Sequence, residues 1–579
     1  MRTHFPFALL ALIAVASLAG EARAQGGDED PVIQAVLDGR DGDLATLIAQ
    51  KANVNALDGA GVSALGLAVS SGDTALVDRL LKAHANPNLA NALGVTPLFV
   101  AIENGSDELA RMLLDSGADP NVAQVNGETP LMVAVRNGEV EIVRMLLAKK
   151  AKVNAAEKQF GQTALMMAAG RPEIVKMLLA KRADVKAKTK GWDVKNVIYT
   201  PATGTLGLTG IPWNNDGTYT AKMGGTTALL FATQRGDLES AKLLVEAGAD
   251  VNQAAADGTT PLLAALYRWQ IPEDRPIDIQ GALVARPLGG LYYASDCALA
   301  NYFLDQGAKV NVSDRAGYTP LHGALVNLVD PALIALQGNE NGARRKSEYK
   351  PPAEVQAASL ATIKRLLDAG ADPNKATIHP TPGPVGNVRV NPAPPGSTPL
   401  HVAAQVGLAE VTQELVAHGG DPNRVRQDGQ TPFTVAAQVS NLGALKAMVA
   451  GGADLRKIYN PTEKVADPVL SKAEPRSHVT VLHIAAVAAA DSVIEYLVSA
   501  GVPLDVVNDH GETAADLADN QERYRFARAM EGYLNRGGEE SNRPKPVRST
   551  NVTDAFKRAA SSAGANASIS HTTTKSGGR

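Results

Sequence analysis

The chain has 579 residues and a formal net charge of −4, and only 4% of its residues are aromatic. This length exceeds what one compact core holds, so it fits several domains or one long array. The weak negative charge argues against a dedicated nucleic-acid surface, and we expect no nucleic-acid partner. With so few aromatic rings, Ala and Leu must do most of the packing, which suits contacts between helices.

The N-terminus predicts a secretory signal peptide over residues 1–24. Arg2 gives it a positive start, residues 7–18 are apolar, and the small residues Ala22 and Ala24 stand at positions −3 and −1 of a cleavage site. The alternative is an uncleaved membrane anchor, but this apolar run is short and no later stretch reaches about 18 apolar residues. We expect an exported mature chain without an integral membrane segment, in the periplasm or outside the cell.

A short phrase of the form T-P-L-x-x-A recurs along the chain. Its first residues are Ser63, Thr96, Thr129, Thr163, Thr227, Thr260, Thr319, Thr398, Thr431, Thr480 and Thr513. Most neighbouring phrases that are not separated by extra sequence start 33 residues apart. A second phrase, typified by L-L-D-A-G-A-D-P-N, closes each unit, and a partial unit with a degenerate opening precedes the first.

Each repeated unit predicts two short helices, as residues 94–121 illustrate. Thr96 can cap the first helix, and Pro97 suits its first turn, where a missing N–H costs nothing. Gly105 ends this helix, and Gly117 supplies the left-handed residue that closes the second helix. A unit of this size cannot cover its own apolar face, so it must stack on its neighbours.

The period near 33 and the T-P-L-H-x-A phrase resemble the ankyrin repeat, and the resemblance covers most of residues 30–535. It implies an all-α ankyrin-repeat solenoid of about 11–12 helix-turn-helix units over residues 25–535, with an N-terminal cap at about 30–60. Proteins of this family are scaffolds for recognition and share no single reaction.

Some units depart from the pattern. The closing glycine is replaced by Lys51, His84, Lys150 and Arg182, for which a left-handed conformation is unfavourable. We therefore expect looser finger turns in the N-terminal third of the array.

Longer spacings locate five insertions, near residues 187–224, 270–295, 328–356, 375–396 and 456–478. The first, fourth and fifth follow a closing phrase, so they extend the fingers between units. The other two fall between the two helices of one unit. The resemblance places the fingers beside the concave face that such proteins use for binding.

The insertions are rich in large aromatic residues, which dominate the energetics of protein interfaces. We predict a partner-binding patch formed by Trp192, Tyr199, Trp213, Tyr219, Trp269, Tyr292 and Tyr293. In the alternative interpretation, these rings pack locally and hold long loops against the helices.

The last segment, residues 536–579, carries eight Lys and Arg against three Asp and Glu. Its composition is typical of a disordered basic tail.

Catalytic and metal signatures such as H-E-x-x-H, C-x-x-C and G-x-x-x-x-G-K-[ST] do not occur in the sequence. The single cysteine, Cys297, excludes an internal disulfide and is expected to be a small buried residue. The resemblance implies structural roles for His322, His401 and His483. We therefore predict no catalytic residues, no metal and no cofactor.

Together these features predict a monomeric, non-catalytic scaffold that binds a partner protein through its concave face and fingers, in the periplasm or outside a bacterial cell. One alternative is a secreted effector that binds a foreign host protein. Another is an enzyme or ligand-binding protein whose site is built from the insertions.

Overall fold

The computed structural model describes residues 30–196, 219–266, 268–269, 293–294, 297–314, 317–326, 328, 353–378, 396–406, 408–427, 429–459, 478–488 and 491–518. The predicted signal peptide and basic tail lie outside these residues and stay predictions. The chain divides into two compact units, which are described separately. Unit 1 comprises Met1–Asp193 and Lys222–Ala264, and unit 2 comprises Val194–Ala221 and Ala265–Arg579.

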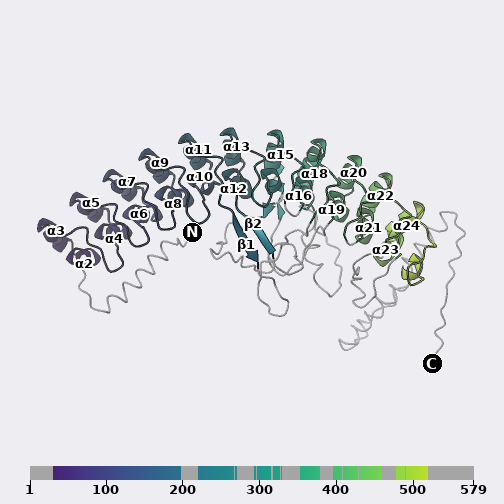
Figure 1. Cartoon of the computed structure of the whole chain (residues 1–579), viewed down its shortest axis with the longest axis horizontal. Coiled ribbons are helices and arrows are strands. Elements are labelled where there is room, and N and C mark those ends of the chain that lie inside the picture. Colours follow the sequence, from purple (N-terminus) through teal and green to yellow (C-terminus); the bar gives the residue numbers. More distant parts are fainter. Residues whose placement is uncertain are drawn as a thin grey trace, which may run out of the picture. The chain divides into compact units, whose positions relative to one another are not determined.

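Unit 1 is a row of helix pairs, which Figure 1 shows side by side. In chain order they are α2 (Pro31–Leu37) with α3 (Asp41–Ala49), α4 (Ala64–Ser71) with α5 (Thr74–Lys82), α6 (Pro97–Glu103) with α7 (Asp107–Asp115), α8 (Pro130–Asn137) with α9 (Val140–Ala148), α10 (Ala164–Met167) with α11 (Pro172–Ala180), and α12 (Ala228–Arg235) with α13 (Leu238–Glu246). The first helices contact one another along the row, and so do the second helices from α5 onward.

Unit 2 repeats this arrangement. The division between the units falls within α14 (Pro261–Leu266), which is followed by α15 (Cys297–Asp305). The later pairs are α16 (Pro320–Val326) with α18 (Ala353–Asp368), α19 (Pro399–Val406) with α20 (Ala409–Ala417), α21 (Pro432–Gln438) with α22 (Leu442–Ala450), and α23 (Val481–Ala488) with α24 (Asp491–Ser499). The repeats are therefore an all-α solenoid, as the sequence predicts.

The repeated phrase forms helices for the expected local reasons, and α8 shows them clearly. The Thr129 hydroxyl accepts a hydrogen bond from the Met132 N–H, and Pro130 occupies the first turn. Gly138 ends the helix with a φ of 81°. The apolar face is fully buried, because each pair is covered by the next pair along the row.

The described strands lie in or directly beside two of the predicted insertions. Strands β1 (Trp192–Asn196) and β2 (Tyr219–Met223) pair in one two-stranded sheet. Strands β3 (Arg268–Trp269) and β4 (Tyr293–Ala294) pair antiparallel in another. These small sheets close the ends of inserted loops and leave the helical repeat unchanged.

The turns without a closing glycine are no looser than the others, contrary to expectation. Lys51, His84, Lys150 and Arg182 adopt φ values of 62–64°, in the same left-handed region as Gly117. The turn after α9 is closed by a bond from the Ala151 N–H to the Leu146 carbonyl at 3.0 Å, and the other turns close in the same way. Such a conformation costs about 1–2 kcal/mol per non-glycine residue. A cation beside the C-terminus of a helix offsets about 0.3–1 kcal/mol of that cost.

Candidate partner-binding surface

Several fingers of unit 1 are tight turns in which an Asp, Asn or Glu side chain accepts hydrogen bonds from its own backbone. The Asp58 carboxylate accepts hydrogen bonds from the Ala60 and Val62 N–H groups at 2.9 and 2.7 Å. The buried Glu157 carboxylate accepts from the N–H groups of three residues, which are Gln159, Phe160 and Gln162. These bonds hold each finger in one shape, as side-chain turns of this kind commonly do.

Consecutive finger tips are also bonded to one another through the main chain. The N–H groups of Val125, Lys158 and Lys190 donate to the carbonyls of Leu93, Asn126 and Phe160 at 3.0, 2.8 and 2.7 Å, respectively. We call the residues Leu93, Val125, Lys158 and Lys190 the finger row. Because backbone bonds join the neighbouring fingers that carry these residues, the finger row is held in one ordered arrangement.

Two lysine side chains reinforce the finger row. The Lys158 ammonium donates to the Val125 carbonyl at 3.1 Å, and the Lys190 ammonium donates to the Lys158 carbonyl at 2.6 Å. Each ammonium group has three protons to donate, so each keeps capacity for a further acceptor. The row therefore presents two positioned cations.

At the base of the fingers, an asparagine from several of the closing phrases ties its unit to the next. The Asn154 carbonyl oxygen accepts from the Asp184 N–H at 2.8 Å, and its amide donates to the Arg182 carbonyl at 3.3 Å. Asn374 and Asn423 make the same pair of contacts in unit 2. This ladder fixes the spacing between fingers.

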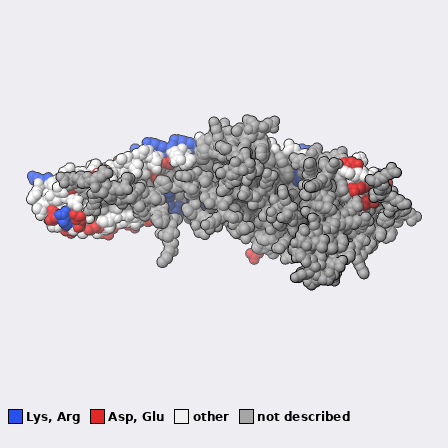
Figure 2. All heavy atoms as spheres, turned by 90° about the horizontal axis from the view of Figure 1, so that it is seen from below, with Lys and Arg blue, Asp and Glu red and all other residues white. Residues whose placement is uncertain are grey.

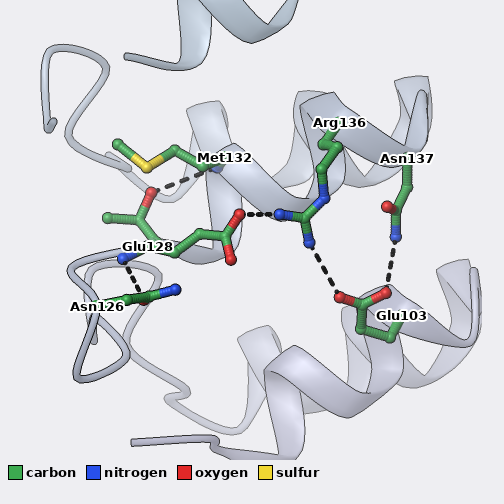
Figure 3. Close-up of polar contacts among 7 residues, drawn as sticks. Glu103, Asn126, Glu128, Met132, Arg136 and Asn137 are labelled. Carbon is green, nitrogen blue, oxygen red and sulfur yellow. Dashed lines mark hydrogen bonds and ion pairs between the residues drawn. The ribbon is translucent and has the colours of Figure 1, made fainter. Parts of the chain in front are cut away.

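A partly buried ion-pair network centred on Arg136, at the end of α8, joins the finger before α8 to the end of α6 (Figure 3). Arg136 pairs with Glu128 and, at 3.3 Å, with Glu103, whose other carboxylate oxygen accepts from the Asn137 amide at 3.2 Å. Burial raises the pKa of the Glu128 carboxyl, while the nearby Arg136 guanidinium lowers it. The network has the form of a structural clamp between two repeats, because each charged group in it is bonded to another protein group.

The histidines of the repeated phrase make structural contacts, as the resemblance implies. The Nδ1 atom of His322 accepts from the Thr319 N–H at 3.3 Å, and its Nε2 lies 3.3 Å from the Ser397 carbonyl in the following unit. His401 and His483 have equivalent partners. Complete burial lowers the pKa of His322 to about 4, so its ring is neutral near pH 7.

The structure places four of the seven predicted aromatic residues, at the level of the backbone. Trp192 begins β1 and Tyr219 begins β2, while Trp269 stands opposite Tyr293 in the register of β3 and β4. Tyr199, Trp213 and Tyr292 lie outside the described residues. The aromatic patch therefore stays a prediction.

The sequence interpretation missed a set of exposed apolar side chains on the fingers. In unit 1, Leu57, Leu93 and Val125 are 46%, 49% and 62% exposed. In unit 2, Ile378, Val425, Ile458 and Val507 occupy finger positions and are also exposed. Their signal in the sequence is a branched apolar residue beside the finger turn, outside both helical stripes.

Three other candidate features are a metal site, the cysteine and a membrane-spanning helix. Within the described ranges, no group of three or more His, Cys, Asp or Glu side chains could hold a metal ion. Cys297 begins α15 and is half-buried, which corrects the expectation of a buried residue, because the first turn of this helix is only partly covered. Of the helices that the structure describes, none has the length and apolar character needed to span a bilayer.

The fold and the finger row define a helical repeat protein with an ordered surface between its repeats. A family model for ankyrin repeats in three copies matches residues 32–124, 121–189 and 353–459, and a single ankyrin repeat model matches residues 224–256. Together these matches cover just over half of the chain, which therefore belongs to the ankyrin repeat family. No curated protein matches the sequence. Ankyrin repeats generally mediate interactions between proteins.

Proposed function

We propose that the chain is a non-catalytic scaffold that binds a partner protein through its fingers and the concave face beside them. The observation that carries this proposal is the exposure of Leu93 and Val125 on a finger row held by main-chain bonds. Exposed apolar side chains on a rigid surface favour association, because little conformational entropy is lost when a partner covers them.

Chemical cross-linking followed by capture tests this function. The full chain is compared with the double variant Leu93→Ser and Val125→Ser, and with the control Leu37→Ser, whose apolar side chain is 44% exposed at the end of α2. We expect the full chain and the control to capture the same one or two proteins, and the double variant to lose them without a change in melting temperature. Absence of any captured protein from the full chain contradicts the proposal.

The aromatic prediction has its own test within this proposal. Trp192→Ala and Trp213→Ala are expected to weaken capture while thermal unfolding stays unchanged. Loss of folding in these variants instead supports local packing of the rings.

We also propose that the mature chain is exported, on the evidence of the N-terminal sequence. Cleavage after Ala24 leaves Gln25 as the first residue. N-terminal sequencing of protein purified from the producing cell tests this, and a chain that retains Met1 contradicts export by this route.

A further inference from the structure

The charge of the repeats reverses sharply at Lys149. Residues 30–148 contain seven Lys and Arg against fifteen Asp and Glu, a net charge of −8. Residues 149–190 contain eleven Lys and Arg against three Asp and Glu, a net charge of +8. A segment this basic stands out in a chain whose total is −4, and it runs from the end of one repeat of unit 1 through the following repeat.

Six of these cations lie on or beside the fingers, and we call them the basic strip: Lys150, Lys152, Lys158, Arg182, Lys188 and Lys190. All six are exposed, and none forms an ion pair with another residue that the structure describes. Figure 2 shows Lys and Arg side chains gathered along one edge of the described part of unit 1. The strip is therefore a concentrated positive surface.

The carboxylates of Glu157 and Asp184, which are close to the strip in sequence, accept hydrogen bonds from the backbone of their own turns. Glu157 is buried and receives three N–H groups, and Asp184 accepts from the Lys186 N–H at 2.8 Å. Lys149, just outside the strip, is paired with Asp115 at 2.9 Å. These neighbouring carboxylates therefore do not neutralise the strip, and its positive charge is accessible to an anionic group from outside this segment.

Two members of the strip keep a charged side chain where glycine is the favoured residue. Lys150 and Arg182 have φ values of 64° and 62°, and the equivalent Gly117 meets no atom within 4 Å of a built Cβ. Lys51 and His84, outside the strip, share this conformation, so the strain does not by itself single out the strip. The inference rests on the charge and exposure of Lys150 and Arg182.

The basic strip is continuous with exposed apolar side chains. The Lys158 ammonium binds the Val125 carbonyl, and the Val125 N–H binds the Leu93 carbonyl. Val125 is 62% exposed and Leu93 is 49% exposed. One rigid row therefore runs from apolar side chains at Leu93 to ammonium groups at Lys190.

We propose that this row binds an extended acidic segment of a partner protein, with its Asp and Glu side chains on the basic strip and apolar side chains of the same segment on Leu93 and Val125. This inference rests on the proposed function and names the chemistry of the partner. A protein segment suits the row because it can carry both carboxylates and apolar side chains at a spacing of one finger. Complementary charges also speed encounter and fix the register of binding.

Fluorescence anisotropy with labelled synthetic peptides tests the proposal on the full mature chain. The probe has four alternating Leu and Val residues followed by six Glu, and the controls replace Glu with Lys or the apolar residues with Ser. We expect the probe to bind, its Kd to rise at least tenfold between 50 and 500 mM salt, and both control peptides to bind at least tenfold more weakly.

Matched variants connect the binding to the strip. The double variant Lys158→Gln and Lys190→Gln is expected to raise the Kd of the probe at least tenfold. The control Lys176→Gln removes an exposed lysine from α11 and is expected to change the Kd less than twofold. Arg182→Gly removes charge and strain together, so the affinity is expected to fall while the melting temperature rises.

Three results overturn the proposal: no binding of the probe, equal binding by the double variant, or stronger binding to anionic phospholipid vesicles or single-stranded oligothymidylate. Cross-linking capture separates this failure from failure of the proposed function. If the double variant still captures the same protein as the full chain, the scaffold function stands and the strip is not its site.

Discussion

At the scale of single residues, buried polar groups hold neighbouring repeats in register. His322 binds within its own unit and reaches the next, and Arg136 links Glu128 of its own repeat to Glu103 of the preceding repeat. Each group is satisfied by a protein partner, so removing the partner of a buried group such as Glu128 leaves that group without compensation. The following two predictions use this asymmetry.

The pH dependence of stability is expected to report His322. Its folded-state pKa of about 4 lies below the usual 6.5, so the unfolded chain takes up a proton first as the pH falls. This ring therefore contributes a loss of about 2 kcal/mol in unfolding free energy between pH 7 and pH 5. Urea unfolding of His322→Gln should show a smaller loss over this range, although the variant is less stable at pH 7. Equal losses in both proteins contradict the assignment.

The Glu128–Arg136 pair is expected to show strong coupling. Arg136→Met leaves the Glu128 carboxylate buried, at a cost of about 1–3 kcal/mol in unfolding free energy. This figure is below the range for fully buried pairs because the Arg136 side chain is 47% exposed. Adding Glu128→Gln should restore part of the loss, and a double-mutant cycle in urea measures it. Additive effects of the two substitutions contradict the clamp.

At the scale of elements, the helices were largely predictable and the finger surface was not. The Thr-Pro start and the glycine stop of α8 are local signals, and 33-residue spacing places each pair. The sequence predicted a looser turn at Lys150, because glycine is the favoured residue at that position. In the structure, hydrogen bonds from the rest of the turn impose the left-handed conformation on this lysine. The exposure of Val125 depends on contacts between fingers, which one sequence does not show.

The asparagine ladder carries the coupling between neighbouring fingers. Asn154→Ala removes two hydrogen bonds to the following unit, so the free energy of unfolding should fall by about 1–3 kcal/mol. Amide hydrogen exchange at Asp184 should accelerate, because its N–H loses its acceptor. Asn126→Ala serves as the control, because the Asn126 side chain accepts a hydrogen bond only from its own finger, at the Glu128 N–H, and the inter-finger bond to the Asn126 backbone carbonyl is kept. Unchanged exchange at Asp184 contradicts the role of the ladder.

At the scale of the whole molecule, an array of small units offers a series of short turns, which we propose as the site for a partner. A repeat protein is stabilised by each unit and by its neighbours, so its surface can vary without loss of the fold. In unit 1, exposed apolar residues lie on the early fingers and cationic residues lie on the later fingers. The repeat period predicted the helical solenoid, but the chemistry of the proposed binding surface became visible only in the contacts of Val125 and Lys158.

Site-specific photo-cross-linking in the producing cell tests the central claim most directly. A photoreactive phenylalanine analogue is placed at Val125, on the finger row, and separately at Lys176, on the exposed face of α11. The scaffold account predicts one discrete protein adduct at position 125 and none at position 176. If position 125 gives no adduct, or if both positions give the same adducts, the finger row does not bind a specific partner protein.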